Sequence, residues 1–237
     1  MPAAFQPTPG SDELTTLARA DGLRGEVVLR RRRTRDGTVY ELIVNGIFAM
    51  DSAETSSEGE LADLALAHTV PGARVLVGGL GLGYTASAAL NHAPGRIDVV
   101  ELEPALVEWA RDGRTPVLAQ LAAEPRVHLL VGDIATTLTD QTQTWDAIIL
   151  DVDNGPDFLL HSENASLYDP DLLGSAYARL APRGRLAIWC QGRSPTLLRT
   201  LTAVAPTARE HIYKVHRGAR RFSYAIYTLD RPADSRL

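Results

Sequence analysis

Arg74-Val75-Leu76-Val77-Gly78-Gly79-Leu80-Gly81-Leu82-Gly83 is the stretch that decides the fold. It begins as an apolar run, ends in a turn with four glycines, and leads into a segment that is compatible with a helix. A second apolar run then ends in Glu101. This order predicts a β-α-β unit that holds an adenosine-containing ligand, with Glu101 accepting hydrogen bonds from the ribose hydroxyls.

The spacing of the glycines argues against a dinucleotide. The dinucleotide fingerprint places its third glycine three positions after the second, and that position here holds Tyr84. A bulky residue there hinders close approach of the helix to a pyrophosphate. The turn is better suited to a nucleoside without phosphates, so a nicotinamide-dependent dehydrogenase is disfavoured.

Acidic residues also stand at the ends of the next two predicted strands. Asp133 follows the run 127–131, and Asp151 ends the run 146–151. In open α/β sheets, ligands bind beyond the carboxyl ends of the strands. We expect Asp133 to accept a hydrogen bond from the adenine amino group and Asp151 to lie at the mouth of the cleft. The expected nucleoside-binding residues are Gly79, Gly81, Gly83, Glu101, Asp133, Ile134 and Asp151.

Strand-like and helix-like runs alternate through most of the chain. Strands are expected at 74–77, 97–101, 127–131, 146–151, 185–190, 209–215 and 222–228. Helices are expected at 57–68, 83–92, 104–111, 134–139, 170–180 and 194–204. This alternation predicts an α/β, Rossmann-like fold with a mostly parallel sheet, closed at one edge by an antiparallel C-terminal hairpin.

The N-terminal part has a different pattern. Ser11 is positioned to cap a short helix that ends at Ala20. The runs 26–33 and 38–44 read as a β-hairpin, with a short third strand at 47–50. We interpret Arg30–Arg33 as a solvated strand edge, because alternate residues of a strand face opposite sides. These features predict a β appendage over residues 1–56, followed by a nucleoside-binding domain over 57–237.

Composition limits the class of protein. The 237 residues carry a net charge of −5, which disfavours a nucleic-acid-binding surface. No apolar run is long enough for a membrane span, and the N-terminus lacks a signal-peptide pattern, so we expect a cytoplasmic protein without a membrane partner. The single cysteine, Cys190, excludes an internal disulfide and a multi-cysteine zinc site. It lies in an apolar run, where a buried thiol is expected.

These motifs together resemble the class I S-adenosylmethionine-binding superfamily and, more narrowly, the spermidine synthase (polyamine aminopropyltransferase) family. The narrower resemblance runs from about Leu42 to Gln191. It rests on the segments 42–47, 75–79, 100–103, 145–151, 166–168 and 180–184. The resemblance implies a class I methyltransferase fold, S-adenosylmethionine or its decarboxylated form as donor, and no metal. It also implies a homodimer, because the appendage resembles one that the family uses for subunit contacts.

The chain departs from that family at several functional positions. The family places an aspartate in its glycine loop to hold the aminopropyl amine, and Gly81 stands there in this sequence. The family's second catalytic-loop acid is replaced by Asn154. Three upstream donor- and amine-binding positions hold Ala49, Glu58 and Gly59, and only Glu60 matches. An altered amine-accepting cleft is therefore expected, in which the remaining negative potential comes from Glu58, Glu60, Asp151, Asp153 and Asp157.

The missing acid at Gly81 removes a repulsion against the carboxylate of intact S-adenosylmethionine. On that ground we predict methyl transfer to an amine or hydroxyl of a small molecule. The alternatives are aminopropyl transfer from decarboxylated S-adenosylmethionine, with Asp153 substituting for the displaced acid, and a non-catalytic nucleoside-binding protein. Asp151 is the expected general base and Tyr168 a hydrogen-bonding catalytic residue, with His161 as an alternative base.

Overall fold

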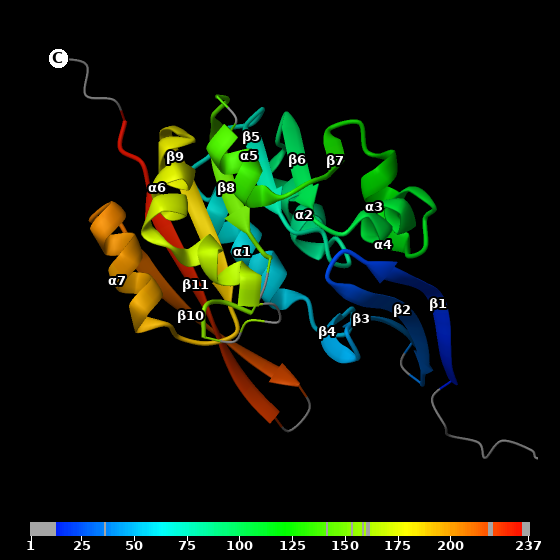
Figure 1. Cartoon of the computed structure of the whole chain (residues 1–237). Coiled ribbons are helices and arrows are strands. Elements are labelled where there is room, and N and C mark those ends of the chain that lie inside the picture. Colours follow the sequence, from blue (N-terminus) through cyan, green and yellow to red (C-terminus); the bar gives the residue numbers. More distant parts are fainter. Residues whose placement is uncertain are drawn as a thin grey trace, which may run out of the picture.

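The structure is a computed structural model that describes residues 13–35, 37–140, 142–152, 154–157, 159, 162–217 and 220–233. It has two β-sheets (Figure 1). The smaller sheet is antiparallel and consists of β1 (Glu13–Gly22), β2 (Gly25–Thr34), β3 (Gly37–Val44) and β4 (Ile47–Asp51). The larger sheet consists of β5 (Arg74–Gly78), β6 (Arg96–Glu101), β7 (Val127–Val131), β8 (Trp145–Leu150), β9 (Leu180–Cys190), β10 (Arg209–Arg217) and β11 (Arg220–Asp230).

The larger sheet has the order β10-β11-β9-β8-β5-β6-β7. Neighbouring strands from β9 to β7 are parallel, whereas β11 pairs antiparallel with β9 and β10 antiparallel with β11. This confirms the predicted α/β, Rossmann-like fold with a C-terminal hairpin. Because β5 pairs with both β6 and β8, the ends of these strands and their following loops meet at one edge, where ligands of such sheets bind.

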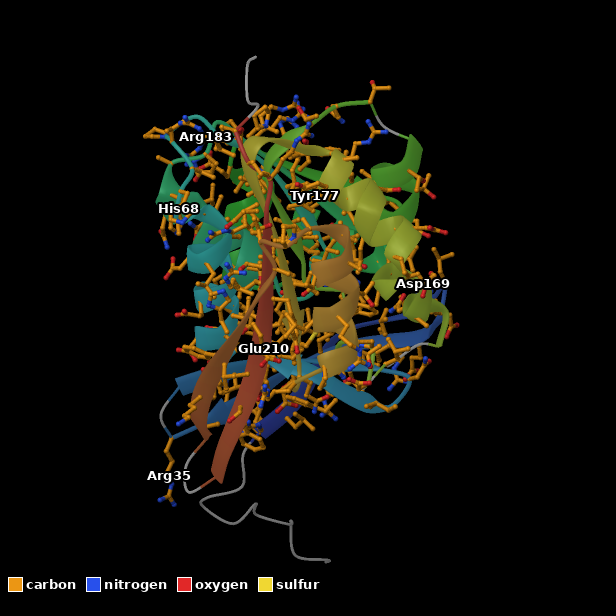
Figure 2. The ribbon with its side chains drawn as sticks, turned by 90° about the vertical axis from the view of Figure 1, so that its left-hand side faces the viewer. Arg35, His68, Asp169, Tyr177, Arg183 and Glu210 are labelled. Carbon is orange, nitrogen blue, oxygen red and sulfur yellow. The ribbon has the colours of Figure 1, made fainter. Side chains whose placement is uncertain are left out.

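Helices cover both faces of the larger sheet. They are α1 (Ser56–Leu66), α2 (Tyr84–Ala89), α3 (Pro104–Arg111), α4 (Pro116–Ala123), α5 (Ile134–Asp140), α6 (Pro170–Ala178) and α7 (Pro195–Val204), with 3-10 helices η1 (Leu90–His92) and η2 (Ser162–Tyr168). Figure 2 views the sheet from its β10–β11 edge, with α1 on one side and α6 and α7 on the other.

Alternation along the strands produces two separate cores. Val75 and Val77 of β5 pack with α1 to α4, whereas Leu76 between them packs with α5, α6 and α7. The smaller sheet joins the first core through Val27 and Leu29. The N-terminal sheet is thus packed against the α1–α4 layer beside the edge where β5 and β6 end.

The expected helix over residues 11–20 is wrong. Ser11 lies outside the described residues, and Glu13–Gly22 forms β1, which pairs along its length with β2. This pairing with a neighbouring strand outweighs the weak local helix signal. It also corrects the interpretation of Arg30–Arg33: β2 is an interior strand, and Arg30 and Arg32 both bond to Glu41 of β3, at 3.0 and 2.8 Å.

Helix α4 was not expected from the sequence. The Thr115 side chain accepts a hydrogen bond from the Leu118 amide, and Pro116 occupies the first turn. This capping pattern is typical of a helix start. The segment is short and rich in alanine and leucine, and it lies between elements with clearer patterns, so no helix is predicted for it. In the described ranges no helix is long and apolar enough to cross a membrane.

Candidate functional site

A cavity of about 500 Å³ lies where the larger sheet meets the N-terminal sheet. Its lining comes from the loops after β5, β6, β7 and β8, and also from β2, β3, β4, α1 and the tip of β11. This volume lies in the range of small-molecule sites, and the position at the carboxyl ends of the parallel strands is typical of this fold class.

The glycine turn brings two strand ends close together. Gly79 has a φ of +93°, and a Cβ there would lie 2.1 Å from the backbone oxygen of Asp151. Gly79 and Gly81 line the cavity. Gly83 does not: a Cβ on it would meet Leu121 of α4 at 2.6 Å, so this glycine permits helix packing.

Glu101, at the end of β6, organises the glycine turn. One carboxylate oxygen accepts a hydrogen bond from the Leu80 amide at 2.7 Å, and the other accepts from the Glu103 amide at 2.8 Å. Burial raises the pKa of Glu101, and these backbone hydrogen bonds oppose that rise. Glu101 also lines the cavity, so the same carboxylate that holds the glycine turn can contact a ligand in the cavity.

Asp133 and Ile134 lie on the same rim. Asp133 is exposed, and its Oδ1 accepts a hydrogen bond from the Ala135 amide at 2.8 Å at the start of α5. Ile134 is 5 % exposed. Both line the cavity. Together they supply one acidic and one apolar surface on the β7 side, where the sequence predicted the adenine.

Asp151 lies at the end of β8 and is anchored on two sides. Its amide donates a hydrogen bond to the Gly78 carbonyl at 2.9 Å, and the Thr85 hydroxyl donates to its Oδ2 at 2.5 Å. Burial raises the pKa of Asp151, and the bond from Thr85 opposes that rise. The side chain lines the cavity in a fixed orientation.

A second buried carboxylate comes from the first turn of α1. Glu58 is 9 % exposed, lines the same cavity, and accepts a hydrogen bond from the Ser57 hydroxyl at 2.6 Å. Burial, and then the charge of Asp151, raise the pKa of Glu58 to about 7. Of the other acids expected to contribute charge, Glu60 and Asp157 do not line the cavity, and Asp153 lies outside the described residues.

Glu58 makes stability depend on pH. An acid whose pKa is higher in the folded than in the unfolded state holds its proton more tightly when folded, so the free energy of unfolding falls as pH rises from about 4.5 to about 7. Glu58→Gln carries no charge at any pH. We expect it to be more stable than the wild type above pH 7, by up to roughly 3 kcal/mol, and equally stable near pH 4.

Urea unfolding at pH 4, 6 and 8.5 measures this difference. Glu60→Gln is the matched control, since it removes an acid from the same helix at a position that does not line the cavity. A Glu58→Gln variant that is less stable than the wild type at pH 8.5 would contradict the assignment of a buried, repelled carboxylate.

The cavity is strongly acidic overall. Among the described lining residues, Arg24 carries the one positive side chain, and its guanidinium bonds to Asn164 of η2. The lining carboxylates are Asp51, Glu54, Glu58, Glu101, Glu103, Asp133 and Asp151. Sequence reasoning missed Asp51 and Glu54 because their place at the cavity depends on how the N-terminal sheet packs. It also missed Glu103, although that acid stands two residues after Glu101, where β6 ends. The structure therefore provides a site suited to a cationic ligand.

The remaining predicted catalytic residues are placed differently. Tyr168 is 6 % exposed and packs in the core on the α5–α7 side, and it is not among the lining residues, although its neighbour Leu167 is. His161 lies outside the described residues. Cys190 is buried, as expected, and burial raises its pKa to about 12.

Aromatic side chains form another wall of the cavity. Trp189 of β9 and Tyr224 of β11 pack with ring centroids 5.0 Å apart. Both line the cavity together with Phe222 of β11 and Phe48 of β4. Ring faces attract ammonium groups and also contact aliphatic chains. In the described part of the chain, no group of histidine, cysteine and acidic residues could hold a metal ion.

Comparisons with known proteins identify the fold through structure alone. No protein-family model and no curated protein sequence matches the chain. A spermidine synthase in complex with the transition-state analogue AdoDATO matches with a TM-score of 0.74 and 17% identity, over 92% of this chain and 74% of that chain. The spermidine synthase from Thermotoga maritima matches with a TM-score of 0.69 and 16% identity, over 92% and 73%.

The prediction of methyl transfer is wrong on this comparison, because both matching structures are spermidine synthases and the findings favour the aminopropyl alternative. That prediction rested on the missing acid at Gly81, whereas the cavity takes carboxylates from α1 and the N-terminal sheet. The match over most of the chain, the seven-stranded sheet and the N-terminal β-sheet together show that this chain has a spermidine synthase-like fold.

Proposed function

We propose that this protein is an aminopropyltransferase that uses decarboxylated S-adenosylmethionine and a small-molecule amine as acceptor. The observation that carries the proposal is the charge of the cavity, in which carboxylates from both sheets and from α1 outnumber the single described arginine. Decarboxylated S-adenosylmethionine carries a sulfonium and an ammonium group and no carboxylate, so it matches this charge.

The residues around the cavity fit such a donor. In this proposal Glu101 accepts hydrogen bonds from the ribose, and Asp133 and Ile134 contact the adenine. The support is that all three residues line the cavity at the carboxyl ends of parallel strands. Gly79 and Gly81 also line the cavity, and in this proposal they contact the part of the donor that carries the sulfur. When bound, the donor supplies a carbon activated by the sulfonium, which an amine nitrogen attacks.

Asp151 holds the acceptor amine in this proposal. Its carboxylate is fixed by the Thr85 hydroxyl at 2.5 Å, so its remaining oxygen can bind an ammonium or amine in one orientation. Holding the nucleophile in line with the reacting carbon removes much of the entropic cost of the reaction. The aromatic wall around Trp189 and Tyr224 offers a surface for the acceptor's aliphatic chain.

Donor affinity tests the charge argument. Calorimetric titration is expected to show decarboxylated S-adenosylmethionine binding about tenfold or more tightly than the intact form, a difference of about 1.4 kcal/mol or more. 5′-Methylthioadenosine, the expected nucleoside product, should bind as well. Tighter binding of the intact form and of its demethylated product would refute the proposal. Failure of all the nucleosides to bind would refute it in favour of a non-catalytic protein.

A further inference from the structure

Two carboxylates from distant parts of the chain line the same cavity. Glu58 lies in the first turn of α1, and Asp151 follows β8. Each receives a hydrogen bond from a hydroxyl, Ser57 to Glu58 at 2.6 Å and Thr85 to Asp151 at 2.5 Å. Two acids that repel each other in a buried site do not share the same affinity for a proton, which separates their chemical roles.

We propose that Glu58 accepts the proton that the acceptor amine loses, while Asp151 stays ionised and orients that amine. The inference rests on the proposed aminopropyl transfer and adds a residue to it. Glu58 is suited to the role because it is buried at the wall of the cavity that Asp151 also lines. Burial and the charge of Asp151 both disfavour the ionised form of Glu58, so proton uptake by its carboxylate is favourable.

The surroundings of Glu58 support this division. The charges of Asp151 and Glu54 both raise the pKa of Glu58. The charge of Glu58 in turn contributes to raising the pKa of Tyr84, at the start of α2. On the strands that also pack against α1, Arg185 is bound by Asp230 and the Leu64 carbonyl, at the other end of the helix. His211 of β10 bonds to Thr228. Glu58 therefore faces acids, and its pKa of about 7 suits proton exchange near neutral pH.

The proposed step balances as follows. The acceptor ammonium gives one proton to the Glu58 carboxylate, which becomes a neutral carboxylic acid. The freed nitrogen lone pair forms the new C–N bond to the propyl carbon, and the electron pair of the breaking C–S bond goes to sulfur. The products are the aminopropylated amine and 5′-methylthioadenosine, and Glu58 then releases its proton to solvent.

The first test needs no turnover. Glutamate side chains are labelled with ¹³C at the carboxyl carbon, and the Glu58 signal is identified by its absence in Glu58→Gln. A titration midpoint near pH 7 in the wild type is expected, moving to lower pH in Asp151→Asn because the repelling charge is removed. A Glu58 midpoint below pH 5, or one that Asp151→Asn leaves unchanged, overturns the inference.

The second test is the pH dependence of aminopropyl transfer. In the wild type, kcat should rise with pH through a limb near pH 7, and Glu58→Gln should lose about 10²-fold in kcat together with that limb. Asp63→Asn, which removes an exposed acid of α1 that does not line the cavity, should retain both. A Glu58→Gln variant that keeps the limb overturns the inference even if the transfer itself is confirmed.

The two tests separate the inference from the function on which it rests. A near-neutral Glu58 titration in a protein that forms no 5′-methylthioadenosine with any amine overturns the aminopropyl transfer, and with it the role of Glu58 in that transfer. An active transferase with a Glu58 signal that titrates below pH 5 confirms the transfer and overturns only the role of Glu58. Thermal unfolding and circular dichroism of Glu58→Gln establish that it is folded.

Discussion

Asp151→Asn is expected to lower kcat for aminopropyl transfer by about 10³-fold. Asparagine keeps the size of the side chain but removes the charge that holds the amine. It also turns one acceptor oxygen into an NH₂ donor, which no longer suits the Thr85 hydroxyl that donates to Asp151. The nucleophile then loses both its anchor and its fixed direction, while the nucleoside contacts at Glu101 are left in place.

Steady-state kinetics at saturating donor measure this loss. Asp157→Asn is the matched control, because Asp157 is an exposed acid a few residues further along the same loop and does not line the cavity. We expect it to retain wild-type kcat. A fall of less than tenfold in Asp151→Asn would show that Asp151 does not position the nucleophile.

Glu101→Gln is expected to weaken donor binding by about 100-fold, or roughly 3 kcal/mol. Both carboxylate oxygens of Glu101 accept backbone hydrogen bonds, from Leu80 in the glycine turn and from Glu103. The glutamine side chain has one acceptor oxygen and one NH₂ donor. One of the two backbone N–H groups, of Leu80 or Glu103, would therefore face another donor in a buried place and lose its hydrogen bond. The turn would lose its anchor, and the ribose would lose an acceptor.

Calorimetric binding of 5′-methylthioadenosine measures this effect without turnover. Glu108→Gln, an exposed acid on α3, serves as the control and should bind as the wild type does. Unchanged affinity in Glu101→Gln would place the nucleoside elsewhere in the cavity. A loss confined to the decarboxylated donor, with 5′-methylthioadenosine unaffected, would place Glu101 beside the amine end.

The part of the site built by the parallel sheet could be predicted from the sequence. Glu101, Asp133 and Asp151 each follow an apolar run, and parallel strands align their carboxyl ends on one edge. Local pattern is sufficient there because strand, turn and acid are contiguous. Gly79 follows the same logic, since the close approach to Asp151 requires a residue without a side chain.

The other half of the site could not be predicted, because it depends on packing between distant segments. The turn between β1 and β2 is held over the cavity by the Leu23 amide, which donates to Glu103 at 2.8 Å, and by Arg24, which bonds to Asn164. No local pattern indicates these contacts. For the same reason Asp51 and Glu54 could not be counted as part of the cavity charge, and the glycine at position 81 was given too much weight in choosing the donor.

The most direct test offers both donors together. The protein is incubated with equal amounts of decarboxylated and intact S-adenosylmethionine and with 1,4-diaminobutane or another amine from a panel, and the products are identified by mass spectrometry. Aminopropyl transfer predicts 5′-methylthioadenosine, formed in step with an amine that is heavier by one aminopropyl group. Formation of S-adenosylhomocysteine with a methylated amine, and no 5′-methylthioadenosine, would contradict the account.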